Sequence, residues 1–232
     1  MDNNEFLAEK KRFLYSLVLP SIFVILCVLL WLLEFAFGTK FSFLGIYPRS
    51  TQSLYGIITY VFVHANVGHL FGNMVSFFIL SVCLFYFYRD VAYKIFVLLW
   101  LLSGILLWFV GRDGCHIGAS GLIYGLAFFL FWSGIFKKYT RLIAISLLVA
   151  FLYGNLVWGM LPLKIDDPTS WEGHLSGAVA GFFFAILFRK EGPVRVEHHW
   201  NEEEDDEPEI EENISNTETD TLNPSEKETT IV

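Results

Sequence analysis

A serine, a histidine and an asparagine occupy three separate apolar stretches of this sequence, each at a similar distance from a basic residue. Ser120 lies 17 residues before the next basic residue, His174 lies 15 before, and Asn73 lies 16 before. At ~1.5 Å per helical residue, each would be roughly 22–26 Å from that charge. Polar groups at one depth of an apolar bundle indicate a functional site. A nucleophile, a base and an amide that stabilises an oxyanion are the groups that acyl transfer requires.

Small residues surround Ser120 in the string Gly118-Ala119-Ser120-Gly121. They allow a sharp backbone turn and close approach of a substrate. Because a helix start has unpaired N–H groups, the N–H of Ser120 is placed to face a developing oxyanion. The alternative is a packing motif, since Gly121 and Gly125 have the spacing that suits close contact between helices.

His174 follows Gly173 at the expected start of another helix, and Gly177 and Gly181 continue a stripe of small residues below it. We expect this stripe to pack against the glycines that follow Ser120 and to bring Ser120 and His174 within hydrogen-bonding reach. Tyr124, one turn below Ser120, would then stack on the imidazole. The alternative is a histidine at the membrane interface near a helix end.

No carboxylate is well placed to orient His174. Glu34 lies at the far end of the first apolar run, and Glu172 precedes the histidine by two positions, so in a helix it faces elsewhere. The sequence therefore predicts a Ser–His dyad without an acid, in contrast to a three-residue arrangement.

His69 and Asn73 are four residues apart and share one face of a helix. Their N–H groups are suited to donate to the oxyanion of acyl transfer. The alternative is a structural pair that bonds to loop backbone, an interpretation that fits His64 and His116 better.

The elements that must position these residues are apolar helices. The chain is 54% hydrophobic and 18% aromatic, and its apolar residues fall into blocks whose length fits a bilayer. The sequence predicts an all-α membrane protein with six transmembrane helices. The expected helices are Leu14–Phe37, Gly68–Tyr88, Tyr93–Val110, Ser120–Phe136, Leu142–Trp158 and Gly173–Phe188.

Basic residues set the expected orientation. Eleven Lys and Arg residues lie near the N-terminus or at the ends of the second, fourth and sixth expected helices, which share one side of the membrane. Four lie on the other side. This asymmetry predicts that both termini are cytoplasmic. The first apolar run is about twice the length of a signal-peptide core and lacks a clear cleavage site, so we expect a retained helix.

We expect three regions: a cytoplasmic lead-in, residues 1–12; a membrane domain, 13–190; and an acidic tail, 191–232. Residues 202–212 carry nine acids and no base, which predicts a disordered, solvated tail. The three cysteines have no metal-ligand spacing, and no metal, cofactor or nucleic-acid partner is expected. So compact a multi-pass chain is expected in a bacterial plasma (inner) membrane.

Taken together, the chain resembles the rhomboid intramembrane serine proteases. Three segments carry the resemblance, on the second, fourth and sixth expected helices in the family's order. They are His64-Ala65-Asn66-Val67-Gly68-His69-Leu70-Phe71-Gly72-Asn73, Gly118-Ala119-Ser120-Gly121-Leu122-Ile123-Tyr124-Gly125, and Gly173-His174-Leu175-Ser176-Gly177 with Gly181.

The resemblance implies that Ser120 is the nucleophile and His174 the general base. It implies an oxyanion hole formed by His69, Asn73 and the N–H of Ser120, with Tyr124 supporting His174. It further implies substrates that are transmembrane helices, cut near their outer end within the bilayer. One departure is the first loop: many members carry a Trp-Arg pair there, whereas this chain has Arg49 without an adjacent Trp.

Three other classes of function fit the sequence less well. A catalytically inactive relative that binds membrane helices is the main alternative, although every residue of the dyad and oxyanion hole is present. A transporter would often show an internal repeat or a midplane charge, and neither is found. The His-Glu-x-x-His string of zinc proteases and the paired intramembrane Asp residues of aspartyl proteases are also absent.

Overall fold

A computed structural model describes residues 3–152, 160–161 and 170–193. All of them belong to the first of two units into which the chain divides, Met1–Val196 and Glu197–Val232. The expected acidic tail lies outside the described residues except for its first three. Most of the loop expected at 159–172 and the end of the fifth expected helix lie outside them too.

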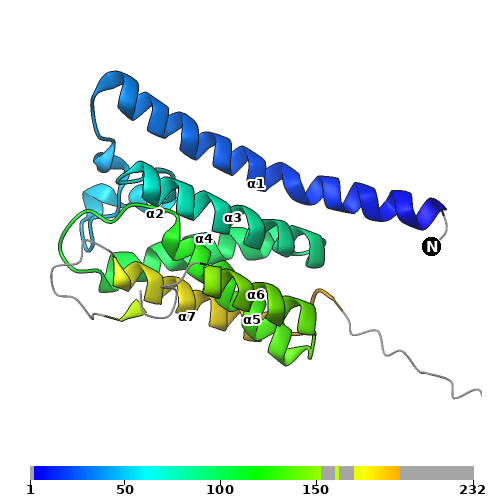
Figure 1. Cartoon of the computed structure of the whole chain (residues 1–232). Helices are drawn as coiled ribbons and strands as arrows, with labels where there is room; N and C mark the ends of the chain where they lie inside the picture. The colour runs from blue at the N-terminus through cyan, green and yellow to red at the C-terminus, as the bar shows by residue number, and fades with distance from the viewer. Residues whose placement is uncertain (1–2, 153–159, 162–169, 194–232) are drawn as a thin grey trace, which may run out of the picture. The chain divides into compact units, whose positions relative to one another are not determined.

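The prediction of an all-helical fold is confirmed for the part of the chain that the structure describes (Figure 1). A single isolated β-bridge, between Ile46 and His116, accompanies the helices there. The α-helices are α1 (Asn3–Phe37), α2 (Gly56–Thr59), α3 (Val67–Phe87), α4 (Ala92–Val110), α5 (Ser120–Phe136), α6 (Thr140–Leu152) and α7 (Trp171–Leu187).

The helix α1 begins much earlier than its apolar run. Residues 3–12, expected from the sequence to be a lead-in, belong to the same helix as the run that follows. The reason is a contact with α3: the Arg12 guanidinium donates to the Tyr86 carbonyl at 2.8 Å, and the Tyr86 hydroxyl donates to Glu9 at 2.7 Å. Farther along, Phe23 stacks on Phe77 of α3 with ring centroids 4.0 Å apart.

The segment between α1 and α3 folds into short turns, η1 (Ser42–Leu44), η2 (Thr51–Ser53), α2 and η3 (Tyr60–Phe62). Arg49 adopts the left-handed conformation, with φ 61°. Its N–H donates to the Trp108 carbonyl at 3.0 Å, its guanidinium donates to the Gly111 carbonyl at 2.7 Å, and the Trp108 indole donates to the Ser50 carbonyl at 3.1 Å. The end of α4 therefore supplies a tryptophan close to Arg49 in space, although none is adjacent in sequence.

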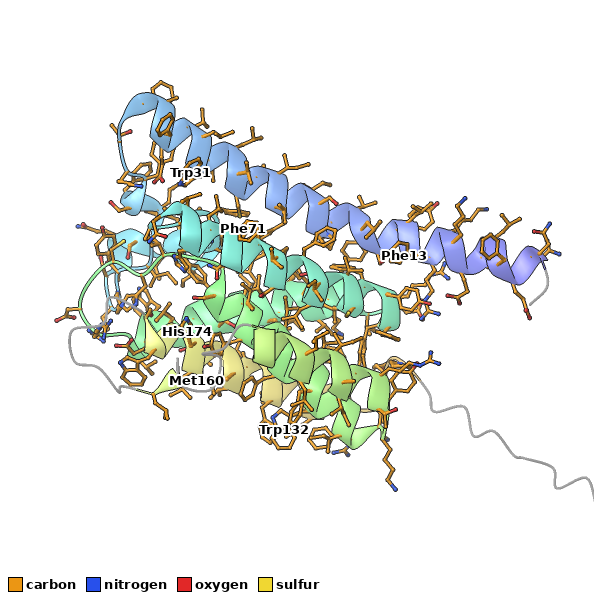
Figure 2. All side chains as sticks on the ribbon, viewed as in Figure 1. Phe13, Trp31, Phe71, Trp132, Met160 and His174 are labelled. Atoms are coloured by element: carbon orange, nitrogen blue, oxygen red, sulfur yellow. The ribbon has the colours of Figure 1, made fainter. Side chains whose placement is uncertain are left out.

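Within the described ranges, three helices, α1, α3 and α4, are long and apolar enough to cross a membrane. The helices α5 and α7 are apolar but have 17 residues each. Large apolar side chains are exposed on several of the helices drawn in Figure 2, among them Phe13 at 50% and Phe71 at 71%. An exposed apolar surface of this extent is expected where the surrounding solvent is lipid.

The core centres on α5, whose bounds are those expected from the sequence. Its buried side chains include Leu122, Tyr124 and Phe129, and α7 lies alongside it (Figure 1). The helix α7 begins at Trp171, two residues before the expected start at Gly173, because the Ser170 hydroxyl caps it by accepting from the Gly173 N–H at 3.2 Å.

Candidate active site

Ser120 is the first residue of α5 and is half-buried. The turn that delivers it depends on Gly118, whose φ of +112° disfavours any other residue. The Gly118 N–H donates to the Tyr60 carbonyl at 2.9 Å, which ties this turn to η3. The backbone therefore enters α5 from a fixed direction, with Ser120 at the helix N-terminus.

The helices α5 and α7 pack backbone to backbone through glycines. A Cβ added at Gly177 would overlap the Gly121 carbonyl oxygen, and one added at Gly181 would overlap the Gly125 carbonyl oxygen. At Gly121 it would lie 3.0 Å from the Gly173 carbonyl oxygen. Since early residues of α5 meet early residues of α7, the helices run parallel, and their N-terminal ends lie together.

This packing brings His174 against α5. The imidazole is buried, with 7% of the residue exposed. The Tyr124 ring stacks on it with centroids 4.2 Å apart and planes 9° from parallel. Tyr124 is one turn beyond Ser120, so the stack fixes the plane of His174 close to the start of α5, at the end of α7 labelled in Figure 2.

His69 and Asn73 lie on α3 against the turn before Ser120. A Cβ added at Gly118 would lie 2.7 Å from Cε1 of His69 and 3.5 Å from Nδ2 of Asn73. Asn73 is fully buried, whereas His69 is half-buried. The α3 N-terminus is capped by Asn66, whose side chain accepts from the His69 N–H at 2.8 Å. Glycine at position 118 is thus needed for conformation and for space.

His64 supports the same turn from below. Its Nε2 accepts a hydrogen bond from the Ala119 N–H at 3.4 Å, and Nδ1 lies 3.3 Å from the Phe62 carbonyl, which assigns the proton to Nδ1. Burial, reinforced by the nearby His69, lowers the pKa of His64 to about 4. The imidazole is therefore neutral at neutral pH and is able to accept.

Two further contacts connect the turn before Ser120 with the start of the His174 helix. The sequence indicated a structural role for His116 but not its partners, and it gave no role to Glu172. Glu172 is buried and accepts from the Arg112 N–H at 3.3 Å, with the Arg112 Nε 3.6 Å from the same carboxylate oxygen. Nδ1 of His116 lies 2.6 Å from the Ser170 hydroxyl, and its Nε2 lies 2.9 Å from the Arg112 carbonyl. For the Glu172 contact, the only signal in the sequence was the presence of an acidic residue directly before Gly173 and His174.

The chemistry that this arrangement suits is nucleophilic. An imidazole activates a serine hydroxyl by taking its proton, and His69 and Asn73 bring side-chain N–H donors to the same turn. Cys115 is a poor rival, because burial raises the pKa of its thiol and its Sγ donates to the Ser42 carbonyl at 3.1 Å. Among the residues that the structure describes, no cluster of three His, Cys, Asp or Glu is suited to hold a metal ion.

The comparison with protein families supplies the identification. The Rhomboid domain model matches residues 51–191, which is more than half of the chain and includes all three segments described above. The chain belongs to the rhomboid family. The resemblance inferred from the sequence is therefore confirmed, and α1 lies outside the matched region of this rhomboid.

Relatives of this rhomboid occur in distant organisms. It is 36% identical over 172 residues to an uncharacterized protein of Mycobacterium tuberculosis, covering 71% of this chain and 72% of that protein. It is 26% identical to the Rhomboid-related protein 1 of Caenorhabditis elegans, covering 60% of this chain and 41% of that one. With the RHOMBOID-like protein 1 of Arabidopsis thaliana the identity is 27%, over 58% and 36% of the two chains.

Proposed function

We propose that this rhomboid is an intramembrane serine endopeptidase. The observation that carries the proposal is the stack of Tyr124 on His174 across the glycine contact of α5 and α7. The stack holds the His174 imidazole beside the N-terminus of α5, where Ser120 is the first residue. Membership of a family that acts on transmembrane substrates adds support.

In the proposed reaction, the Ser120 hydroxyl attacks the carbonyl carbon of a peptide bond and gives its proton to His174. The carbonyl oxygen becomes an oxyanion, which accepts hydrogen bonds from His69, Asn73 and the Ser120 N–H. Collapse expels the amine, which takes the proton from His174 and leaves an acyl group on Ser120. Water then hydrolyses this ester with His174 again as base.

We further propose that the membrane domain, residues 13–190, crosses the bilayer six times, with the N-terminus in the cytoplasm. The distribution of basic residues supports this orientation. A single-pass or other transmembrane protein would be the substrate, cut near the outer face. The mycobacterial relatives favour the plasma membrane of a bacterium. Reporter fusions that fluoresce only in the cytoplasm, placed after Arg89 and after Arg112, test the arrangement: only the first should fluoresce.

The main alternative is an inactive rhomboid that binds membrane helices without cutting them. The purified full chain is labelled in detergent with a fluorescent fluorophosphonate, beside Ser120→Ala, His174→Ala and a rhomboid of known activity. Labelling of the wild type alone supports the proposal. If the reference protein labels and the wild type does not, the inactive alternative replaces it. Thermal unfolding of both variants near the wild-type temperature is the control for folding.

A further inference from the structure

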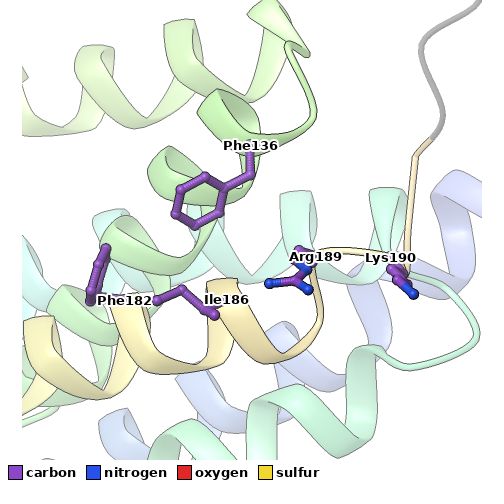
Figure 3. Close-up of a pocket in the computed structure, with 5 residues that line it drawn as sticks. All are labelled: Phe136, Phe182, Ile186, Arg189 and Lys190. Atoms are coloured by element: carbon purple, nitrogen blue, oxygen red, sulfur yellow. The ribbon is translucent and has the colours of Figure 1, made fainter.

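A hollow lies between the ends of α5 and α7 that are remote from Ser120 and His174. Its volume is about 720 Å³, and five residues line it: Phe136, Phe182, Ile186, Arg189 and Lys190 (Figure 3). Its lining residues lie 8 to 16 residues beyond His174 along α7 and 16 residues beyond Ser120 along α5, which corresponds to roughly 12–24 Å from the candidate active site. The hollow therefore serves no part of the proposed reaction.

The helix side of the hollow is apolar and supported by aromatic packing. Phe136, Phe182 and Ile186 are each about two-fifths exposed, at 42%, 41% and 40%. Trp132 packs against both phenylalanines, with ring centroids 5.9 Å from Phe136 and 5.1 Å from Phe182. The packing of Trp132 therefore supports an apolar wall along this side of the hollow.

The other side of the hollow is positively charged. Arg189 and Lys190 follow the last turn of α7 and are exposed. No ion pair of either is found among the described residues. The nearest acid in sequence is Glu191, whose charge acts on Lys137. Burial lowers the pKa of Lys137, and the negative charge of Glu191 partly offsets this shift. Within the part of the chain that the structure describes, the two cations are thus available to an anion.

We propose that this hollow binds an anionic phospholipid, with its phosphate on Arg189 and Lys190 and an acyl chain along Phe136, Phe182 and Ile186. Basic residues beside an apolar groove at the end of membrane helices match the two parts of such a lipid. The acidic segment of this chain, residues 202–212, matches less well, because Ile210 and Pro208 are its only apolar residues. A zwitterionic lipid would place a cation beside the two basic side chains.

Native mass spectrometry of the full chain, released from detergent, tests the proposal with phosphatidylglycerol and phosphatidylcholine of identical acyl chains. We expect tighter binding of phosphatidylglycerol and a loss of about tenfold in its affinity in the double variant Arg189→Gln/Lys190→Gln. The matched control is Lys10→Gln/Lys11→Gln, which removes the same charge from α1 and should leave the affinity unchanged. Phe182→Ala should weaken binding of both lipids by shortening the apolar wall.

Four results would overturn the proposal. Equal binding of the two lipids, or an equal loss in the α1 control, would show that the site does not select an anionic headgroup. Displacement of the lipid by millimolar glycerol 3-phosphate would identify the ligand as a free phosphate. If phosphatidylglycerol binds only after removal of residues 202–232, the acidic segment is the occupant instead. Thermal unfolding checks that each variant is folded, and no outcome depends on Ser120.

Discussion

The two ends of the α5–α7 pair are built in opposite ways. At the Ser120 end, glycine backbones touch, and the buried Glu172 and His116 join the loop before Ser120 to the start of α7. At the Arg189 end, the same helices border a hollow with exposed aromatic and basic side chains. One helix pair thus holds a rigid, polar end suited to chemistry and an open, amphipathic end suited to lipid.

The glycine contact gives the sharpest test of this contrast. Gly177→Ala should destabilise the protein by about 3 kcal/mol, because the new methyl group would overlap the Gly121 carbonyl and backbone cannot yield as a side chain does. Thermal unfolding in detergent measures the loss. Gly68→Ala is the matched control: its added Cβ would meet only Asn66 Oδ1, at 3.4 Å, and stability should change by less than about 0.5 kcal/mol. Equal unfolding temperatures would contradict the close contact.

Acid should loosen the Ser120 end. Because the pKa of His64 falls to about 4 on folding, from 6.5, its contribution to stability is complete above pH 6.5 and is lost as the pH drops toward 4. The loss over this window is on the order of 3 kcal/mol, and unfolding measured at stepped pH reports it. The variant His64→Gln retains a side-chain acceptor for the Ala119 N–H, but its amide does not titrate over this pH range. An unchanged pH dependence in this variant would exclude His64 as the source.

The buried carboxylate should matter more than an exposed one in the same region. Glu172→Gln keeps the side chain's size but weakens its contact with Arg112, so we expect a loss of about 1–2 kcal/mol in the free energy of unfolding. Asp113→Asn makes the same change in the exposed pair with Arg49 and should cost less than about 0.5 kcal/mol. Equal effects of the two substitutions would mean that burial adds nothing to the Arg112–Glu172 contact.

The ring stack on His174 can be tested through the rate of fluorophosphonate labelling. Tyr124→Leu removes the aromatic face that fixes the imidazole, and labelling of Ser120 should slow by about tenfold. Tyr124→Phe retains the ring and should label at least about fivefold faster than the leucine variant. If the two variants label equally, the stack does not position His174.

The smallest effect is expected at the Arg189 end. In detergent without added lipid, Arg189→Gln should change stability by less than about 0.5 kcal/mol, since the residue is exposed and outside the glycine contact. Added phosphatidylglycerol should then raise the unfolding temperature of the wild type more than that of the variant, because a ligand stabilises only the form that binds it. A large loss of stability in Arg189→Gln without lipid would show that side chains at the Arg189 end stabilise the fold, as the contacts at the Ser120 end are expected to do.

Much of this architecture could be predicted from the sequence, because apolar runs mark membrane helices. The bounds of α5 coincide with its run, and the spacing of Gly177 and Gly181 indicated a contact surface. The extension of α1 to Asn3 could not, since residues 3–12 are mostly polar and their partner, Tyr86, is distant in sequence.

Contacts between a loop and a distant helix could not be predicted, for a similar reason. Arg112, in the loop after α4, and Glu172, in the first turn of α7, are 60 residues apart, and charged residues at such positions are ordinarily solvated, so nothing in the sequence marks them as partners. Trp108 likewise reaches Arg49 only through folding, because it belongs to α4 and not to the first loop. Residue types indicated the chemistry, whereas these long-range contacts set its geometry.

The peripheral position of α1 has a consequence for chain connectivity. The helix buries only 22% of its apolar window and precedes the matched Rhomboid domain, and its contacts with the bundle include those of Glu9, Arg12, Phe23 and Cys27. Its link to the rest, near Gly38, is exposed and has open space around it. A gene split at this point would yield two polypeptides that reassemble in the bilayer, with α1 supplied in trans as a separable subunit.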